Sequence, residues 1–327
     1  MNNYPETTLV IFAYKHEKFI KEAVESALNQ DYPNLTIIIS DDNSPDRTFE
    51  IAQEVIKNYK GTHKIILNKN EKNLGHPAHL NYVLENLVKT DIYIGQSGDD
   101  VSLPNRVSKT MEIFNKYHDV YAVFSNVDLI DEKGKMLKKD FLSYKKGFYT
   151  LEDILLRPIV LGASASYKKE VFNKFGEVKH KFEDWELGYK SAMLGKVYYI
   201  DDVLLEYRSH DNNFGFVGVK KMYRSFKEYK EQKAYFYREH AKILLSILDV
   251  ARGKRNKSLI EFGINFDEFC ENFFSENMLK KNLLSWQLIR FYIKGKALRI
   301  NEIERNIFVC LFSYLSYTIK KFSYNIK

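Results

Sequence analysis

The sequence predicts an α/β domain built on a mostly parallel sheet, followed by a helical C-terminal region. Over the first 125 residues, short apolar runs alternate with segments whose apolar residues recur at helical spacing. This alternation is typical of parallel strands joined by right-handed helical crossovers. From residue 215 onwards the pattern is helical and rich in Tyr, Phe and Lys. We therefore expect two domains, residues 1–214 and residues 215–327.

The expected elements follow from uninterrupted apolar runs, which suit strands buried on both faces, and from the turn signals between them. Ser44 and Pro45, for example, favour a helix start as N-cap and first-turn proline. The expected strands cover residues 8–13, 35–40, 64–67, 91–95, 120–125, 127–130, 160–166, 197–200 and 203–207. The expected helices cover residues 17–28, 44–59, 75–88, 104–116, 151–157 and 182–194.

Composition excludes several classes of protein. Hydrophobic residues make up 45% and charged residues 28%, as in a folded globular protein. The net charge of +7 is uneven, because the last third has about twice as many basic as acidic residues and the rest is slightly acidic. The two cysteines, Cys270 and Cys310, give neither a disulfide framework nor metal-ligand spacing. There is no signal-peptide pattern and no run of about 20 apolar residues. We expect a cytoplasmic protein.

Polar side chains follow three of the predicted strands. They are Tyr14, the pair Asp41 and Asp42, and the pair Asp99 and Asp100. In open parallel sheets, ligands bind beyond the carboxyl ends of the strands. Two adjacent carboxylates repel each other and resist burial, and a hard divalent cation such as Mg²⁺ or Mn²⁺ relieves both problems. The sequence therefore predicts a ligand site at this edge of the sheet.

Several stretches of residues 7–214 together resemble one known family. Four occur in order and with suitable spacing: Val10–Tyr14 with Ala23–Gln30, Ser40–Ser44, Ser97–Asp100 and Glu183–Leu187. A fifth, Tyr207–His210 with Asn213, resembles the closing loop of members that build bacterial surface sugars. The chain resembles the family 2 glycosyltransferases, which have the GT-A fold and transfer sugars from nucleotide diphosphates with inversion.

The resemblance implies a nucleotide site at the strand ends. Tyr14 matches the aromatic residue beside the base, and Asp41 and Asp42 match the pair that recognises base and ribose. A carboxylate accepts a hydrogen bond from an imide N–H, which favours uridine. For Asp42, helix capping is the alternative reading. The full set implied for nucleotide binding is Ala13, Tyr14, Asp41, Asp42, Asn73, Gly75 and Asp99.

The resemblance also implies the reacting groups. Asp184 matches the catalytic base, and Asp100 matches the ligand of a Mn²⁺ or Mg²⁺ ion that bridges the diphosphate. Glu183 precedes the base and is a further candidate. His210 is either another metal ligand or a loop histidine bonded to the backbone. Arg208 either balances a phosphate charge or pairs with an acidic residue of the sheet.

Two questions stay open at this level. The family pattern usually has Asp where this chain has Ser97, so Asp99 and Asp100 can divide the ribose and metal roles in either order; we assign the metal to Asp100. The same departure leaves a non-catalytic sugar-nucleotide-binding or scaffold protein as the alternative. A sugar nucleotidyltransferase or a dehydrogenase is disfavoured, because Tyr14–Glu17 stands where a glycine-rich phosphate loop would be.

The implied partners are a nucleotide-sugar donor, with a UDP-sugar favoured, and a glycan or polyprenyl-linked acceptor of lipopolysaccharide or capsule synthesis. The basic, aromatic C-terminal region suits peripheral contact with the inner face of the cell membrane. Within it, residues 306–319 carry no formal charge and are too short to span; they form either a buried or an interfacial helix. No nucleic-acid recognition motif is present, so nucleic acid is not an expected partner.

Overall fold

A computed structural model describes residues 4–210, 226–251 and 253–274, together with 291, 293–296 and 298. The chain separates into two compact units. The first comprises residues 1–149 and 159–220, and the second comprises residues 150–158 and 221–327. The predicted boundary at residue 214 lies outside the described residues and stays a prediction.

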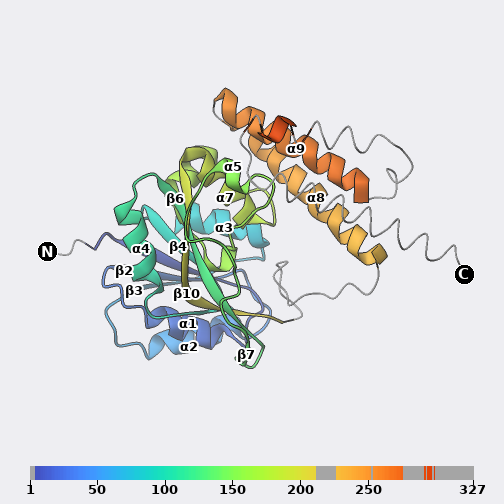
Figure 1. The fold of residues 1–327 in the computed structure, drawn as a ribbon. Coiled ribbons are helices and arrows are strands. Elements are labelled where there is room, and N and C mark those ends of the chain that lie inside the picture. Colours follow the sequence, from blue (N-terminus) through green and yellow to red (C-terminus); the bar gives the residue numbers. More distant parts are fainter. Residues whose placement is uncertain are drawn as a thin grey trace, which may run out of the picture. The chain divides into compact units, whose positions relative to one another are not determined.

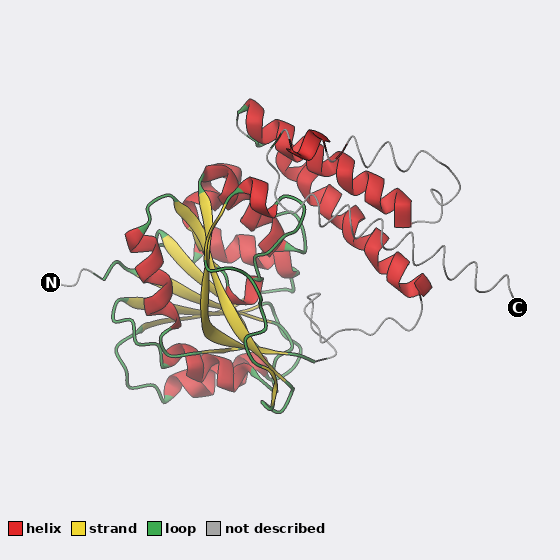
Figure 2. Cartoon of the chain, viewed as in Figure 1, coloured by secondary structure: helices red, strands yellow, loops and turns green. Residues whose placement is uncertain are grey.

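The first unit is organised on one mixed sheet, in the order β3-β2-β1-β4-β9-β6-β10-β5, with β7 and β8 pairing at β6 and β10. Figure 1 shows the sheet edge-on with its helices, and Figure 2 shows helices on either side of it. The strands are β1 (Thr7–Ala13), β2 (Leu35–Asp41), β3 (Lys64–Lys69), β4 (Ile92–Ser97), β5 (Val101–Ser102), β6 (Val120–Ile130), β7 (Met136–Lys138), β8 (Gly147–Tyr149), β9 (Ser166–Lys168) and β10 (Lys196–Arg208). The helices of this unit are α1 (Ile20–Leu28), α2 (Thr48–Lys57), α3 (His76–Asn86), α4 (Arg106–Lys116), α6 (Lys169–Phe175) and α7 (Glu183–Leu194).

The main strands run in one direction. β1 pairs in parallel with β2 and β4, and β2 pairs in parallel with β3. β9 is antiparallel to both β4 and β6, so β6 runs parallel to β4, and β10 runs parallel to β6. The carboxyl ends of β1, β2, β4 and β10 therefore meet at one edge, which confirms the predicted α/β fold with a mostly parallel sheet.

The core explains why the apolar runs formed strands. Every residue of β1 and β2 is buried, as expected for strands covered by helices on both faces. Leu9 and Ile37 of these strands pack in one cluster with Val24 of α1 and Phe114 of α4. Burying each such side chain stabilises the fold by about 1.5–3 kcal/mol before the entropy of ordering it is counted.

Several of the expected elements were wrong in detail, and the two strands expected over residues 120–125 and 127–130 are the single strand β6. Helix α2 begins at Thr48 rather than at Ser44, because Ser44 bonds to the Asp41 side chain and Asp46 accepts the first hydrogen bonds of the helix from Thr48. The expected strand over residues 160–166 is a loop with a 3₁₀ turn at Gly162–Ser164, and β9 follows it. The two strands expected over residues 197–207 are one strand, β10, whose pairing with β6 is irregular after Ile200.

The second unit is helical where it is described. Its helices are α5 (Leu151–Ile154), α8 (Phe226–Leu248) and α9 (Lys254–Phe274). α8 and α9 pack together, and a buried ion pair joins them at 2.7 Å between His240 Nδ1 and Asp267 Oδ2. No helix within the described residues is long and apolar enough to cross a membrane. Cys270 is a buried free thiol, whereas Cys310 and residues 306–319 lie outside the described part of the chain.

Candidate active site

The sheet brings the predicted site residues together at the carboxyl edge. Ala13, the last residue of β1, pairs in register with Asp41 at the end of β2. On the other side, Phe12 of β1 pairs with Ser97, the last residue of β4. The loops that carry Tyr14, Asp42, Asp99 and Asp100 therefore leave adjacent strands, as the strand-end argument predicts.

The loops after β1 and β2 are bonded to each other. The carboxylate of Asp41 accepts hydrogen bonds from the backbone N–H of Ser44 at 2.9 Å and from its hydroxyl. The Ser44 hydroxyl in turn accepts the N–H of Lys15, which has a left-handed φ of 60°. Tyr14 is exposed at 38%, with the Lys15 ammonium 5.1 Å from its ring centroid. The ring is thus available to stack on a ligand.

Asp42 holds the start of helix α3. Its carboxylate accepts the backbone N–H groups of Leu74 and Gly75, each at 2.9 Å, and the side-chain amide of Asn70 at 2.7 Å. Asn73 donates to the Asp42 carbonyl oxygen at 3.1 Å. Gly75 has a φ of 80°, which favours glycine. Asp42 therefore fixes the turn that precedes α3, to which Asn73 and Gly75 also belong, and it accepts none of the N–H groups of the helix itself.

Asp99 and Asp100 lie at the end of β4 and are both buried. His210 bonds to Asp99, with 2.8 Å between Nε2 and Oδ2, and His16 Nε2 lies 3.9 Å from the same oxygen. Asp100 Oδ1 accepts the backbone N–H of Arg208 at 2.9 Å. The other oxygens, Asp99 Oδ1 and Asp100 Oδ2, are buried and have no hydrogen-bond partner among the residues that the structure describes.

These two carboxyl groups differ in their titration. Burial opposes ionisation of Asp99, but the hydrogen bond from His210 and the nearby His16 outweigh it and lower the pKa of Asp99 to about 2. Burial and the charge of Asp99 raise the pKa of Asp100 above its usual range. Two buried carboxyl groups next to each other thus favour a proton or a cation on the pair.

The unpaired oxygens fit a hard divalent cation. Mg²⁺ typically takes one or two protein carboxylates and completes its octahedron with substrate phosphates and water. Among the described residues, no group of three or more His, Cys, Asp or Glu side chains is arranged to hold a metal ion. The buried oxygens of Asp99 and Asp100 therefore suit a cation that is shared with a phosphate ligand rather than one enclosed by protein.

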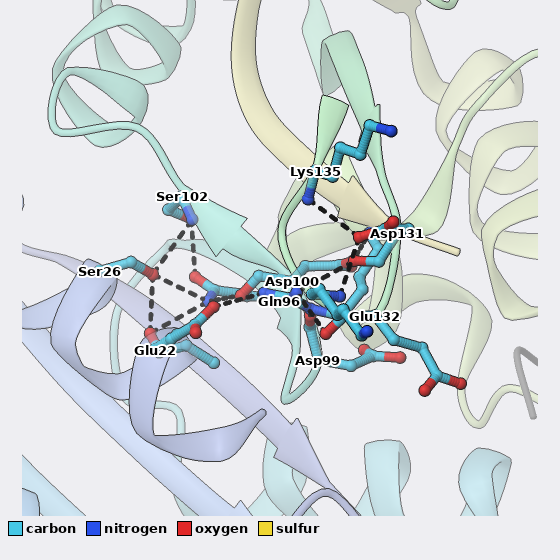
Figure 3. A network of polar contacts seen from close by, with 12 residues as sticks. Glu22, Ser26, Gln96, Asp99, Asp100, Ser102, Asp131, Glu132 and Lys135 are labelled. Carbon is cyan, nitrogen blue, oxygen red and sulfur yellow. Dashed lines mark hydrogen bonds and ion pairs between the residues drawn. The ribbon is translucent and has the colours of Figure 1, made fainter. Parts of the chain in front are cut away.

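Arg208 is buried at the end of β10 and bonds mainly to backbone oxygens. Its Nε donates to the Asp99 carbonyl at 2.8 Å, and its Nη1 donates to the carbonyls of Asp131 and Glu132 at 3.2 and 3.3 Å. Its Nη2 pairs with the Glu22 carboxylate of α1. Figure 3 shows Asp99, Asp131 and Glu132 near Asp100, with the Glu132 side chain pointing away and Glu22 on the other side of the network. The acidic partner lies on α1, whereas one of the two expected roles had it in the sheet, and the role of Arg208 toward a phosphate stays a prediction.

The side chain of Arg106 stabilises the loop that carries Asp99 and Asp100. The fully buried guanidinium donates to Ser102 Oγ at 2.9 Å and to the carbonyls of Gly95 and Ala163. Ser102 Oγ donates to Gln96 Oε1, and Gln96 Nε2 donates to the Asp100 carbonyl at 3.1 Å (Figure 3). Burial lowers the pKa of Arg106 to about 10, against the charge of Asp100. The conformation of the acidic loop is therefore fixed by buried polar side chains.

Asp184 lies in the first turn of helix α7, where its carboxylate accepts two backbone N–H groups. The donors are Gly162 to Oδ2 at 3.0 Å and Trp185 to Oδ1 at 2.9 Å. Burial of the carboxyl group and the charge of Glu183 raise the pKa of Asp184 to about 7, although these two hydrogen bonds oppose the shift. A general base works best when its pKa is near the working pH, so Asp184 suits that role.

Sequence reasoning missed two histidines at this edge, His16 and His76. His16 packs against Gly98, where a Cβ would meet its Nδ1. His76 is the first residue of α3 and pairs with Glu183, with 3.0 Å between Nε2 and Oε2. The available signals were the position of His16 three residues beyond Ala13 and that of His76 directly after Gly75, because their partners come from distant parts of the chain.

Comparisons with known proteins agree with this geometry. The fold is that of GT-A glycosyltransferases: S. aureus TarS, solved in complex with UDP-GlcNAc, has a TM-score of 0.62 at 15% identity, over 96% of this chain and 92% of that one. The mannosyltransferase PcManGT from Pyrobaculum calidifontis, solved with GDP-Man and Mn²⁺, has a TM-score of 0.57 at 14% identity, over 98% and 87%. These likenesses show the fold.

Sequence comparison gives the family. The model of glycosyl transferase family 2 matches residues 8–176. An uncharacterized glycosyltransferase of Methanocaldococcus jannaschii is 30% identical over 245 residues, which are 71% of this chain and 82% of that protein. The putative glycosyltransferase EpsE of Bacillus subtilis is 35% identical over 41% of this chain and 47% of its own length. The chain belongs to glycosyl transferase family 2 and is a glycosyltransferase, so the predicted family, GT-A fold and enzyme class are confirmed.

Proposed function

We propose that the protein is an inverting, metal-dependent glycosyltransferase that moves a sugar from a UDP-sugar to a glycan or polyprenyl-linked acceptor of surface polysaccharide synthesis. The observation that carries the proposal is the Asp184 carboxylate. It is oriented by two backbone N–H groups, its pKa is near 7, and it lies in the first turn of α7. Asp184 takes the proton from the acceptor hydroxyl as that oxygen attacks the anomeric carbon from the face opposite the diphosphate.

The donor lies along the carboxyl edge of β1, β2 and β4 in this proposal. Tyr14 stacks on the base, Asp41 and Asp42 bond to base and ribose, and Asp99 bonds to the ribose hydroxyls. Asp100 would hold the cation, and His210, which bonds to Asp99, would be a further ligand. The cation, when bound, neutralises negative charge on the departing diphosphate.

Two solved structures with a similar fold support the proposal of a nucleotide-sugar donor and a divalent cation. TarS was solved with UDP and with UDP-GlcNAc, and the mannosyltransferase was solved with GDP-Man and Mn²⁺. Because these two bind different bases, the preference for uridine rests on the residues of this chain, chiefly Asp41. Contact with the inner face of the membrane belongs to the same proposal and rests on the basic composition of the C-terminal third.

A donor panel tests the proposal directly. The full chain is incubated with individual UDP-, GDP- and dTDP-sugars and Mn²⁺, with crude bacterial lipid as acceptor, and release of nucleoside diphosphate is measured. We expect release from one or two UDP-sugars. If no donor releases diphosphate while nucleotide still binds, the proposal is overturned and the non-catalytic alternative is favoured.

Replacing Asp100 with alanine is expected to weaken UDP binding at least tenfold when Mn²⁺ is present, with little change when it is absent. The reason is that the substitution removes a proposed cation ligand, whereas the nucleoside contacts remain. Titration calorimetry with UDP, with and without Mn²⁺, measures the difference. Asp91→Ala is the control, because Asp91 is an exposed carboxylate at the opposite end of the same strand. An equal loss with and without Mn²⁺ would count against the ligand role.

Replacing Gly162 with alanine is expected to lower kcat for sugar transfer by roughly tenfold, since about 1.4 kcal/mol corresponds to a factor of ten. A Cβ at this position would lie 3.1 Å from Asp184 Cβ, 3.1 Å from Glu183 Oε1 and 3.3 Å from Asp184 Oδ2. The alanine therefore displaces the base from its acceptor-facing position.

Gly95→Ala is the matched control for this substitution, because its nearest neighbour would be the Ala165 carbonyl at 3.6 Å, an ordinary contact. Steady-state rates and melting temperatures of both variants distinguish the cases. A Gly162→Ala variant that melts like the native protein and keeps full activity would refute the displacement.

A further inference from the structure

An ion pair joins the starts of two helices beside the proposed base. His76 is the first residue of α3, and Glu183 is the first residue of α7. The imidazole Nε2 and the carboxylate Oε2 are 3.0 Å apart, with 35% and 20% of the two side chains exposed. A cation at the start of a helix opposes the helix dipole, so the acidic partner accounts for its placement there.

The Glu183 carboxylate lies close to that of Asp184. The site of a Cβ on Gly162 would be 3.1 Å from Glu183 Oε1 and 3.3 Å from Asp184 Oδ2, so both carboxylates approach the same glycine. Two like charges at this separation raise the free energy of ionising the second one. His76 is therefore placed where its proton offsets the charge that Glu183 adds beside the base.

We propose that His76 is a positioning residue for the base: its imidazolium neutralises Glu183 and so sets the pH at which Asp184 can accept the proton of the acceptor hydroxyl. The proposal rests on the proposed role of Asp184. His76 acts on Asp184 through its pairing with Glu183 and is assigned no contact with the reacting hydroxyl.

The charges around His76 and Glu183 agree with the proposed effect of this pair on Asp184. The charge of Glu183 raises the pKa of His76, against the effect of burial, and Asp184 and Asp42 raise it further. In the other direction, His76 lowers the pKa of Asp184, which burial and Glu183 raise.

Among the described residues, three further titratable groups near this cluster are His79, Tyr93 and Tyr167, and the Asp42 carboxylate also acts on His76. Burial lowers the pKa of His79 to about 4, and its Nε2 bonds to Ser40 Oγ at 2.7 Å. Burial raises the pKa values of the phenols of Tyr93 and Tyr167, which feel the charge of Glu183. Glu183 and His76 are therefore the two charged side chains whose opposite effects on the pKa of Asp184 the proposal uses.

The pH dependence of kcat/KM tests the proposal. Replacing His76 with glutamine leaves Glu183 uncompensated, so the pKa of Asp184 rises and the acidic limb moves to higher pH, by about 0.5–1 unit. Replacing Glu183 with glutamine removes the negative charge, so the limb moves to lower pH by a similar amount. In the double variant the limb returns towards its original position, because both charges are gone. His118→Gln, at an exposed residue just before β6, is the control and leaves the limb unchanged.

Several results would overturn the inference. One is a His76→Gln variant with a raised donor KM and an unmoved acidic limb, which would mean that His76 binds the donor. Another is equal loss at every pH in all three variants, which would mean a purely structural role.

A measurement without catalysis separates this inference from the proposed function. In the full-length protein with ¹³C-labelled histidine, the His76 resonance is assigned by its absence in H76Q, and its titration is followed by NMR. We expect its midpoint to fall in E183Q. If that midpoint is unchanged, the pairing is refuted whatever Asp184 does. If it falls while Asp184→Asn remains fully active, the pairing is present but the proposed base is wrong, and the positioning role fails with it.

Discussion

Replacing Asp184 with asparagine is expected to lower kcat for sugar transfer by about 10²–10⁴-fold, the usual contribution of a positioned general base. Asparagine has nearly the same shape, but it has a single acceptor oxygen, so it keeps only one of the two hydrogen bonds from Gly162 and Trp185 and its NH₂ group faces the other donor. What it cannot do is take a proton at neutral pH. Melting temperatures are therefore measured alongside the rates, to separate loss of the base from loss of stability at the start of α7. UDP binding with Mn²⁺ should change by less than about threefold, because no nucleotide contact is assigned to Asp184.

The same assignment predicts a pH profile for the native protein. Since the pKa of Asp184 is about 7, kcat/KM should rise as pH increases through that value and level off above it. Initial rates between pH 5.5 and 9, together with calorimetric UDP titrations, check both expectations. Asp202→Asn is the control, because Asp202 is an exposed carboxylate on β10. An Asp184→Asn variant that keeps native activity would refute the assignment.

Replacing Lys190 with methionine is expected to destabilise the protein by about 3–5 kcal/mol, the cost of leaving a buried partner charge unpaired. Lys190 Nζ and Glu186 Oε1 are 2.7 Å apart on α7, with only 3% and 2% of the side chains exposed. The other Glu186 oxygen accepts the backbone N–H groups of Lys179 and His180, which fixes the loop before the helix. Because Asp184 lies at the start of the same helix, loss of this ion pair should also reduce the rate of sugar transfer.

Lys174→Met is the matched control for this effect. Lys174 also pairs with a glutamate four residues away, Glu170, at 2.6 Å, but the two side chains are 38% and 44% exposed. Exposed pairs of this kind contribute about 0–1 kcal/mol. Urea unfolding of both variants measures the difference. The double variant Glu186→Leu with Lys190→Met should recover part of the loss, and equal stability of the two single variants would contradict the account.

Much of the fold could be predicted from the sequence, because burial of a strand on both faces leaves a continuous apolar run. The runs at Leu9–Ala13 and Leu35–Ser40 were therefore readable without the structure. The stretch Val160–Ser166 was not, since its small residues suit a tight turn as well as a strand. That turn matters, because Gly162 donates to the proposed base.

Only part of the candidate site could be predicted from the sequence, for a related reason. Strand ends share an edge by topology, so Asp41 and Asp99 could be placed near each other from the order of the strands. The bond between His76 and Glu183 could not be placed, because it depends on how α7 packs more than a hundred residues later. The sequence also could not show that Arg106 and Arg208 stabilise the acidic loop. Both arginines donate to backbone carbonyl oxygens, which every residue has, so the bonds depend on no particular side chain.

Arg208 donates hydrogen bonds to the carbonyl oxygens of Asp99, Asp131 and Glu132. This has an evolutionary consequence. A backbone carbonyl is present whatever the side chain, so the anchor tolerates substitution at positions 131 and 132 as long as the turn keeps its path. The hairpin that begins there can therefore change its surface chemistry without disturbing the acidic loop at the end of β4. A lineage of such enzymes could alter what it recognises beyond this hairpin while its donor chemistry stays constant.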